Sequence, residues 1–194
     1  MLILASESPR RRELLKQLGA DFEIIPAAVE EFSDGDEPEK LPEKNALLKA
    51  RYVAERFPEA FVLGADTGVF DTRKMLGKPR SREEALAMLL SLSGRSHQVI
   101  SGVALISLSR GICRSWSVRS QVTFRGFTPA DAELYMEKVN VMDKAGAYAI
   151  QDHAGILGAV WEGELENIIG LPLAALTKIL REYDLLPPEP EKSF

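Results

Sequence analysis

The chain has 194 residues, of which 45% are hydrophobic, and its 29 acidic and 24 basic residues give a net charge of −5. This length and hydrophobic content suit a folded domain with a substantial core, and the negative balance argues against a general nucleic-acid binder. The single cysteine, Cys113, excludes an intramolecular disulfide and a cysteine-rich zinc site.

The sequence gives no sign of secretion or of membrane insertion. Its N-terminus lacks a basic segment followed by an apolar one, and no apolar run approaches the roughly 20 residues that span a bilayer. We therefore expect a cytoplasmic protein with no membrane partner. We expect a single domain over 1–186 and a disordered, proline-rich tail over 187–194.

The first expected elements are a buried strand over 2–5 and a helix that begins at Pro9 and ends before Gly19. Ser8 is a suitable N-cap for this helix. Its first turn carries arginines at 10–12, which the helix dipole disfavours by roughly 0.3–1 kcal/mol each. Free N–H groups beside guanidinium groups indicate a phosphate site, and a solvated basic turn is the alternative.

A second strand is expected over 22–25, followed by a polar, acidic loop over 30–45. A helix begins near Pro42 and ends before Pro58, with one apolar stripe. Lys49 flanks this stripe, so its stem can lie on the core while its ammonium group reaches a cleft. An ordinary surface lysine fits the pattern equally well.

The next apolar run, 61–65, is expected to be a buried strand that ends at Asp66. Open α/β sheets bind ligands just past the carboxyl ends of such strands, which makes Asp66 a candidate site residue. A turn aspartate is the alternative interpretation. A small hairpin is expected over 68–76, and Ser81 begins a capping box for a helix that reaches Leu92.

The rest of the chain predicts a long antiparallel pair of strands, 98–108 and 112–124. A helix over 128–139 follows, then a glycine-rich stretch with short strands over 145–163. The last helix starts after Gly170. Because strands and helices alternate, the fold class is α/β with an antiparallel portion in the sheet.

Several short motifs occur in a characteristic order. They are Ser-x-Ser-Pro-Arg-Arg-x-Glu-Leu-Leu at 6–15, Glu30-Glu31, Lys49-Ala50-Arg51, Gly-Ala-Asp-Thr at 64–67, Leu-Gly-Lys-Pro at 76–79, Leu-Ser-Gly-x-x-His-x-Val at 92–99, Asp-Lys-Ala-Gly-Ala-Tyr-x-Ile-Gln at 143–151 and Asn-x-x-Gly-Leu-Pro at 167–172. Together they resemble the Maf family of nucleoside triphosphate pyrophosphatases, over nearly the whole chain.

The resemblance implies an elongated mixed β-sheet flanked by helices, with two lobes around a central cleft. It also implies hydrolysis of a nucleoside triphosphate between the α and β phosphates, giving the monophosphate and pyrophosphate. The expected cofactor is a divalent cation, Mg²⁺ or Mn²⁺. The expected partners are the nucleotide and a second copy of the chain in a cytoplasmic homodimer, with no nucleic acid.

The same resemblance assigns roles to particular residues. The family's catalytic acid falls on Asp66, which is treated as the base that activates water. Its other polar cleft residues fall on Ser6, Arg11, Glu31, Lys49 and Lys78. The positions that separate its subfamilies fall on Arg10, Thr67 and Gln151, and this combination resembles the subfamily that acts on dTTP and UTP.

The chemistry of these residues suits the implied reaction. Attack on a phosphoanhydride requires neutralised phosphate charge and an oriented water, and Arg11, Lys49 and Lys78 can supply the first. Asp66 and Glu31 can hold a hard cation or take the proton from water, and the sequence leaves open which carboxylate does which. We expect His97 to brace a turn rather than to act as an acid or base.

The substrate is the last expectation. The amide of Gln151 offers a donor and an acceptor, which match the ring N–H and carbonyl of uracil and thymine. Alternatives are a hydrolase of modified nucleotides such as 7-methyl-GTP and a nucleotide-sensing regulator of cell division with little turnover.

Overall fold

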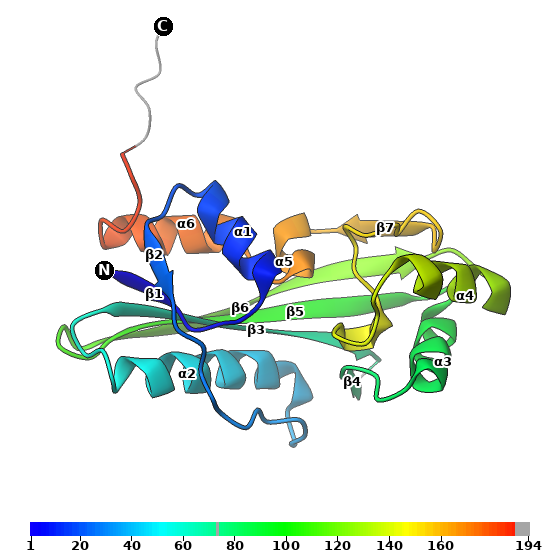
Figure 1. The fold of residues 1–194 in the computed structure, drawn as a ribbon, viewed down its shortest axis with the longest axis horizontal. Helices are drawn as coiled ribbons and strands as arrows, with labels where there is room; N and C mark the ends of the chain where they lie inside the picture. The colour runs from blue at the N-terminus through cyan, green and yellow to red at the C-terminus, as the bar shows by residue number, and fades with distance from the viewer. Residues whose placement is uncertain (73, 189–194) are drawn as a thin grey trace, which may run out of the picture.

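The computed structural model describes residues 1–72 and 74–188. Its strands form one seven-stranded sheet in the order β2-β1-β3-β5-β6-β7, and β4 pairs with β3 beside this path (Figure 1). In chain order the elements are β1 (Leu2–Leu4), α1 (Pro9–Gln17), β2 (Phe22–Ile24), a 3-10 turn (Pro38–Lys40), α2 (Leu41–Ala54), β3 (Phe61–Asp71), β4 (Lys74–Leu76), α3 (Arg82–Leu92), β5 (Ser96–Ser107), β6 (Ile112–Phe124), α4 (Pro129–Lys138), a second 3-10 turn (Ala145–Ala147), β7 (Ala159–Glu162), α5 (Leu165–Ile169) and α6 (Leu173–Glu182).

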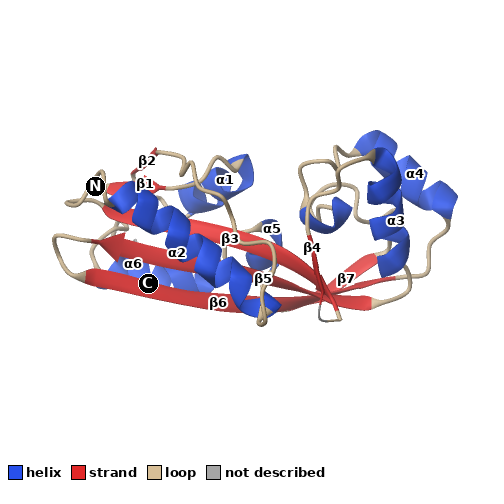
Figure 2. Cartoon of the chain, turned by 90° about the horizontal axis from the view of Figure 1, so that it is seen from below, coloured by secondary structure: helices blue, strands red, loops and turns tan. Residues whose placement is uncertain are grey.

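The elements form two lobes on one continuous sheet. In the first lobe, α2 covers one face of the sheet, while α1 and α6 cover the other (Figure 1). In the second lobe, α3, α4 and β4 gather around the far end of β3 and β5, and β3, β5 and β6 run from one lobe into the other (Figure 2). β1 is parallel to β2 and β3, whereas the remaining pairs are antiparallel. The expected α/β class with an elongated mixed sheet is therefore confirmed.

The side chains of β3 point alternately to the two faces of the sheet, and this separates the two cores of the first lobe. Val62 packs with Ala50 of α2, whereas its neighbour Leu63 packs with Leu15 and Leu176 on the opposite face. Successive side chains of a strand point to opposite faces, so one continuously apolar strand serves both layers. This explains why 61–65 has no polar positions.

The second lobe has its own core at the other end of the long strands. Val69 of β3 and Val99 of β5 pack there with Leu89 of α3, Tyr135 of α4 and the buried Leu157. The sheet therefore links two cores, and the stretch of β3 between them is where the lobes meet.

β3 does not end at residue 65, as the sequence analysis expected, but continues to Asp71. Its pairing with β5 is unbroken, with Asp66 opposite Gly102 and Phe70 opposite Gln98. A long partner strand and the strand-forming residues that follow Asp66 sustain the extended backbone. Asp66 is thus a mid-strand residue, and the expectation that it follows the strand was wrong.

The other edge of β3 is only partly covered. β1 pairs with it as far as the Leu4–Leu63 pair, and β4 pairs with it from Val69 onward. Among the described strands, none pairs with β3 on that edge between these two points. A ligand can therefore approach the middle of a buried sheet from its side.

Two glycines let α2 lie unusually close to the sheet. A Cβ atom at Gly64 of β3 would meet the backbone of Ala46, and one at Gly102 of β5 would meet the backbone of Pro42 and Glu43. Both contacts would be too short for real atoms, so these positions admit no side chain while α2 stays in place.

The helix starts have their expected N-cap residues, but the capping box expected at Ser81 is only half formed, because the Glu84 carboxylate accepts from the Arg80 N–H at 2.6 Å and not from Ser81. The Ser8 hydroxyl accepts from the Arg11 N–H at 3.5 Å, and the Ser81 hydroxyl accepts from the Glu84 N–H at 3.2 Å. Thr128 and Asp131 form a reciprocal capping box at the start of α4. In the described residues, no helix is both long and apolar enough to cross a membrane.

Some local expectations need correction. The loop expected over 30–45 is shorter, because a 3-10 turn at Pro38–Lys40 leads into α2 at Leu41. The stretch 145–163 contains one strand, β7, and the short helix α5 was not anticipated. Of the expected tail, 189–194 lies outside the described residues, so its disorder stays a prediction.

Candidate functional site

A cleft of about 710 Å³ opens where the edge of β3 is free between the lobes. All the site residues expected from the sequence line it. They are Ser6, Arg10, Arg11, Glu31, Lys49, Asp66, Thr67, Lys78 and Gln151. The fold therefore brings together residues that lie up to 145 positions apart, Ser6 and Gln151 being the extremes.

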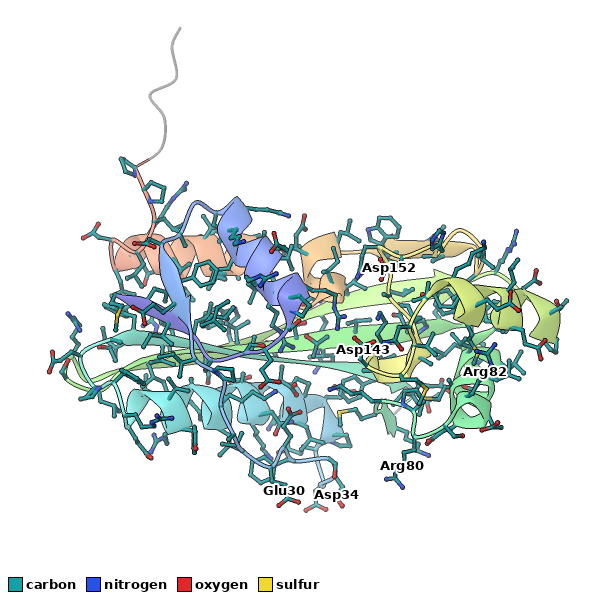
Figure 3. All side chains as sticks on the ribbon, viewed as in Figure 1. Glu30, Asp34, Arg80, Arg82, Asp143 and Asp152 are labelled. Atoms are coloured by element: carbon teal, nitrogen blue, oxygen red, sulfur yellow. The ribbon has the colours of Figure 1, made fainter. Side chains whose placement is uncertain are left out.

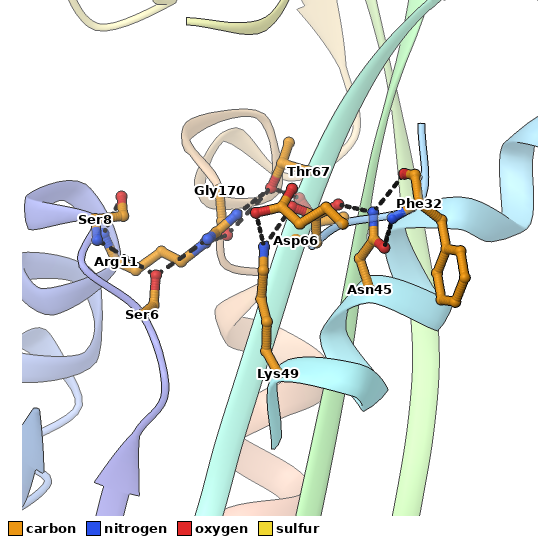
Figure 4. A network of polar contacts seen from close by, with 11 residues as sticks. Ser6, Ser8, Arg11, Phe32, Asn45, Lys49, Asp66, Thr67 and Gly170 are labelled. Carbon is orange, nitrogen blue, oxygen red and sulfur yellow. Dashed lines mark hydrogen bonds and ion pairs between the residues drawn. The ribbon is translucent and has the colours of Figure 1, made fainter. Parts of the chain in front are cut away.

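The charged centre of the cleft is an ammonium group between two carboxylates. Lys49 Nζ lies 2.9 Å from Asp66 Oδ1 (Figure 4). It also lies 2.9 Å from Glu31 Oε1. Lys49 and Asp66 are buried, whereas the Glu31 side chain is 51% exposed. Lys49 thus reaches the cleft from the buried side of α2, and it is not an ordinary surface lysine.

Asn45 completes this cluster, although it is not among the site residues expected from the sequence. Its side-chain amide donates to Asp66 Oδ2 at 3.0 Å and to the Phe32 carbonyl at 3.0 Å, and its oxygen accepts from the Phe32 N–H at 2.8 Å. Asn45 thereby ties the segment that carries Glu31 to β3. A buried polar residue one helical turn before Lys49 was the available signal, because such pairs share a helix face.

Arg11 forms the centre of the opposite side of the site. Its Nε donates to the Gly170 carbonyl at 2.9 Å, and its two terminal nitrogens donate to Ser6 Oγ at 3.1 Å and to Thr67 Oγ1 at 3.2 Å (Figure 4). Burial lowers the pKa of Arg11, and the negative charge of Asp66 opposes this shift. The side chain nevertheless stays charged at neutral pH, because an arginine pKa is so high.

These contacts correct one expectation. From the sequence, an arginine in the first turn of α1 is expected to be electrostatically unfavourable without a bound anion. The protein instead supplies oxygen partners to Arg11 from three separate segments. Arg11 therefore joins α1 to β3 and to the chain after α5, and it has a structural role as well.

The site surrounds β3 from both faces. Asp66 and Thr67 are adjacent in the strand, so their side chains point in opposite directions. Asp66 meets Lys49 and Asn45 from α2, whereas Thr67 meets Arg11 from α1. A ligand at the free edge of β3 can therefore contact both sets of groups.

The two arginines beside Arg11 differ from it. Arg10 lines the cleft, and its guanidinium lies 3.9 Å from Asp143 in the second lobe. Arg12 is exposed and pairs with Glu13 at 3.1 Å. The phosphate-site interpretation of 10–12 thus fits Arg10 and Arg11, while Arg12 belongs to a solvated turn.

Neighbouring acidic residues differ in whether they line the cleft. Glu30 and Asp34 project outward from the loop before α2 (Figure 3). Glu31, which lies between them in sequence, lines the cleft. Asp143 and Asp152 lie on the segment that forms the second wall of the cleft (Figure 3). Of the Glu30-Glu31 motif, only Glu31 lines the site.

The second lobe contributes Lys78, Lys144 and Gln151 to the cleft. Lys78 is exposed, whereas Lys144 is buried and donates to the Asn140 carbonyl at 2.6 Å. Gln151 is exposed, and its amide nitrogen lies 3.4 Å from Asp152 Oδ2. Lys78 and Gln151 therefore present free surface to a ligand.

Buried tyrosines hold this wall in place. The Tyr135 hydroxyl accepts from the Ala149 N–H at 3.0 Å and donates to the Ala149 carbonyl at 3.2 Å. Burial raises the pKa of Tyr135 to about 12, so the hydroxyl keeps its proton. The backbone also passes through positive φ at Gly146 (68°) and Ala147 (61°), which makes the segment depend on such anchors.

The second anchor is a histidine, His97, whose Nε2 lies 2.7 Å from the hydroxyl of Tyr148. His97 lies within β5 and is buried, so the expectation that it braces a turn was wrong. Burial lowers its pKa to about 4, which keeps the ring neutral at pH 7. His97 therefore acts in packing and tethering, and the cleft lining does not include it.

The carboxylates of the cleft have the chemistry of a hard-cation site. Asp66 and Glu31 share one ammonium group, so both carboxylates face a common point. Within 1–72 and 74–188, no group of three or more His, Cys, Asp or Glu side chains is placed to hold a metal ion. Oxygen ligands from one or two carboxylates and from substrate phosphates are the usual arrangement for Mg²⁺.

Comparison with known proteins identifies close relatives. A family model described as Maf-like protein matches residues 1–183. A dTTP/UTP pyrophosphatase of Dehalococcoides mccartyi is 43% identical over 187 residues, covering 96% of this chain and 84% of the relative. A dTTP/UTP pyrophosphatase of Akkermansia muciniphila is 45% identical over 180 residues, covering 92% of this chain and 94% of the relative.

A solved structure with a similar fold is the Staphylococcus aureus Ham1 protein. It matches with a TM-score of 0.55 at 13% identity, covering 94% of this chain and 98% of that one. At this identity the likeness concerns the fold alone. It agrees with the elongated mixed sheet described above.

Proposed function

Because the chain belongs to the Maf family, we propose that it is a nucleoside triphosphate pyrophosphatase that hydrolyses dTTP and UTP. Water attacks the α-phosphorus, the bond between the α-phosphorus and its bridging oxygen breaks, and pyrophosphate leaves. The products are the nucleoside monophosphate and pyrophosphate. The relatives named above carry this activity in their names.

One observation carries the proposal. A buried aspartate, Asp66, is fixed by Lys49 and Asn45 at the free edge of a strand, and Arg11 lies on the other side of that strand. The arrangement places a carboxylate and guanidinium N–H groups at one cleft. A phosphoanhydride needs this combination of a proton acceptor and charge neutralisation.

The first lobe is suited to the triphosphate. Arg11 has five N–H groups, and its contacts with Gly170, Ser6 and Thr67 use three of them. The others can bind phosphate oxygens beside the start of α1. Lys78, across the cleft, is suited to stabilise the charge that develops on departing pyrophosphate.

We assign proton transfer to Asp66. Its orientation is fixed by the bonds to Lys49 and Asn45, and each carboxylate oxygen keeps a lone pair for a water. Glu31 is more exposed and can move with its loop as the ligand enters. Lys49, between them, holds both carboxylates in place and balances their charge.

Asp66 and Glu31 are also the residues that would hold Mg²⁺ or Mn²⁺, with the phosphates supplying further oxygen ligands. The bound ion would neutralise phosphate charge and polarise the scissile bond. The expected signature is loss of activity in EDTA and its recovery with excess Mg²⁺.

Gln151 supports the choice of pyrimidine. It lines the second-lobe wall with an exposed amide, close to the segment anchored by Tyr135 and Tyr148. A fixed amide pairs with the N–H and carbonyl of uracil or thymine, whereas cytosine would need it reversed. Guanine offers the same order as uracil, so the size of the pocket must exclude it.

Two other functions remain as alternatives for the test. A hydrolase of modified nucleotides would prefer a substrate such as 7-methyl-GTP, and a nucleotide-sensing regulator of cell division would bind without useful turnover. We further propose a cytoplasmic homodimer, on the basis of the family. The intact cluster of Asp66, Glu31 and Lys49 favours turnover.

The deciding experiment measures pyrophosphate and orthophosphate release from dTTP, UTP, CTP, GTP and 7-methyl-GTP with Mg²⁺ or Mn²⁺. We expect pyrophosphate alone, with the highest kcat/KM for dTTP and UTP. Preference for 7-methyl-GTP would contradict the proposed substrates but not the proposed pyrophosphatase reaction. Release of orthophosphate, or nucleotide binding without turnover, would contradict the reaction itself.

A further inference from the structure

Thr67 stands in a chain of hydrogen bonds that runs from the cleft into the core. Its Oγ1 lies 3.2 Å from a terminal nitrogen of Arg11 and 2.8 Å from Oγ of Ser101, the residue opposite it on β5. Ser101 Oγ in turn donates to the Asn167 carbonyl at 2.9 Å. Ser101 and Asn167 are fully buried.

The two ends of the chain fix the direction of every bond. A guanidinium can only donate, and a carbonyl can only accept. Because each hydroxyl has a single hydrogen, Arg11 donates to Thr67, Thr67 to Ser101, and Ser101 to Asn167. The other acceptor near Thr67, the Gly170 carbonyl at 3.4 Å, also lies on the protein side. The hydroxyl hydrogen of Thr67 therefore points into the protein.

Ser6, the other hydroxyl on Arg11, differs. Its oxygen accepts from Arg11 at 3.1 Å and from the Ser8 N–H at 3.3 Å. Its own hydrogen takes part in no hydrogen bond found among the described residues, so it can be donated to a ligand. Phosphate oxygens only accept hydrogen bonds, so Ser6 can bind them and Thr67 cannot.

We propose that Ser101 is a positioning residue of this site: it holds the Thr67 hydroxyl as an acceptor for Arg11 and thereby fixes the guanidinium toward the phosphates. In this role Thr67 positions Arg11 and does not itself bind the nucleotide. The inference deepens the proposed pyrophosphatase function and depends on it for the identity of the ligand.

The end of this series of hydrogen bonds, at Asn167, is held in place, as this role requires. The side-chain amide of Asn167 lies between β5 and β6, with its oxygen turned toward Ser120 and its nitrogen toward Val118 and Ser101. Asn167 therefore anchors α5 to the sheet, and the carbonyl that receives the last bond cannot turn away. The position of Arg11 is thus fixed through contacts with buried residues of the core.

The test is a double-mutant cycle between Ser101→Ala and Arg11→Ala, with kcat/KM for dTTP and the Kd of inorganic pyrophosphate as readouts. Without Ser101 to accept its hydrogen, the Thr67 hydroxyl is no longer held toward Arg11, and loss of that Arg11–Thr67 bond to a charged group predicts about tenfold weaker values for Ser101→Ala in the wild-type background. In the Arg11→Ala background the same change should alter either readout by less than about twofold. Equal losses in both backgrounds would overturn the proposal.

Ser107→Ala is the matched control. Ser107 is also fully buried and lies six residues further along β5, where its hydroxyl accepts from Arg110 and not from the site. We expect both readouts unchanged in this variant. A loss as large as that of Ser101→Ala would show a general packing effect and would overturn the proposal.

If Ser101→Ala does not fold, Ser101→Cys replaces it, because a thiol is only a weak donor. Thr67→Val, which breaks the next bond, should show the same coupling with Arg11, and Thr67→Ser should restore near-normal values. Additive behaviour of Thr67→Val would also contradict the chain. Failure of the proposed function is distinguishable, since pyrophosphate binding tests the cycle even if wild-type protein does not hydrolyse dTTP.

Discussion

The two walls of the cleft hold their side chains in different ways. In the first lobe, Asp66, Lys49 and Arg11 come from the middle of a strand, from a helix and from a helix start, and they bind one another or the backbone. In the second lobe, Gln151 comes from an irregular segment with positive φ angles that Tyr135 anchors from beneath. The side chains that are proposed to act on the phosphates thus lie on helices and a strand. The wall that is proposed to bind the nucleobase is instead held in place by side-chain contacts such as that of Tyr135.

The largest effect should come from the first wall, with Asp66→Asn. The amide keeps the shape but removes the charge that accepts a proton, which commonly costs on the order of 10²–10⁴ in rate. kcat should fall equally for dTTP and UTP, and the melting temperature should show a folded protein. Asp34→Asn, on the outward loop, is the control, and near-normal turnover by Asp66→Asn would refute the assignment.

Arg11→Ala should come next and should affect both activity and stability. We expect about a hundredfold loss of kcat/KM, by analogy with removal of one oxyanion donor. The partners left at Gly170, Ser6 and Thr67 should lower the free energy of unfolding by about 1–3 kcal/mol. Arg12→Ala, whose side chain is exposed, is the matched control. Unchanged stability of Arg11→Ala in urea denaturation would contradict the structural half of this prediction.

For the second wall, the pH dependence of stability tests the tether. The pKa of His97 is lowered to about 4, below its ordinary value of 6.5. The unfolded chain therefore binds a proton that the folded chain does not, and the free energy of unfolding should fall by roughly 3 kcal/mol between pH 7 and pH 4 on this account. His97→Gln should show a shallower fall. Parallel curves for both proteins would show that His97 is not the group responsible.

The smallest effect concerns substrate choice through Gln151. We expect wild-type protein to prefer UTP over CTP by about tenfold in kcat/KM, since a reversed amide leaves polar groups unpaired. Gln151→Ala should bring the two values within about twofold of each other. Asp66→Asn lowers both rates and should leave the ratio unchanged. If the ratio survives Gln151→Ala, the amide does not select the base.

The sequence predicted the first wall better than the second, for physical reasons. Caps such as Ser8, the apolar stripe of α2 and the apolar run 61–65 are local signals, and they located Arg11, Lys49 and Asp66 on their elements. The end of β3 was misplaced because its continuation depends on β5, whose paired residues lie 28 or more positions away. Pairing between distant strands leaves no mark near Asp66 itself.

Contacts at long range account for the residues that were missed. Ser101 matters because it stands opposite Thr67, and Tyr135 because it reaches Ala149. The role of His97 was wrongly expected because its partner, Tyr148, is 51 positions away. Asn45 alone had a nearby signal, one turn before Lys49 on the same helix.

Gly64 and Gly102, beneath α2, give the charge balance of the cleft an unexpected origin. The ammonium of Lys49 stands 2.9 Å from Asp66 because the axis of α2 can approach the sheet where both glycines lack a methyl group. One added carbon at either position would lift the helix and carry Lys49 and Asn45 away from their carboxylate. The electrostatics of the site therefore depend on two residues that bear no charge. A substitution at either one would change the charge balance through a steric effect alone.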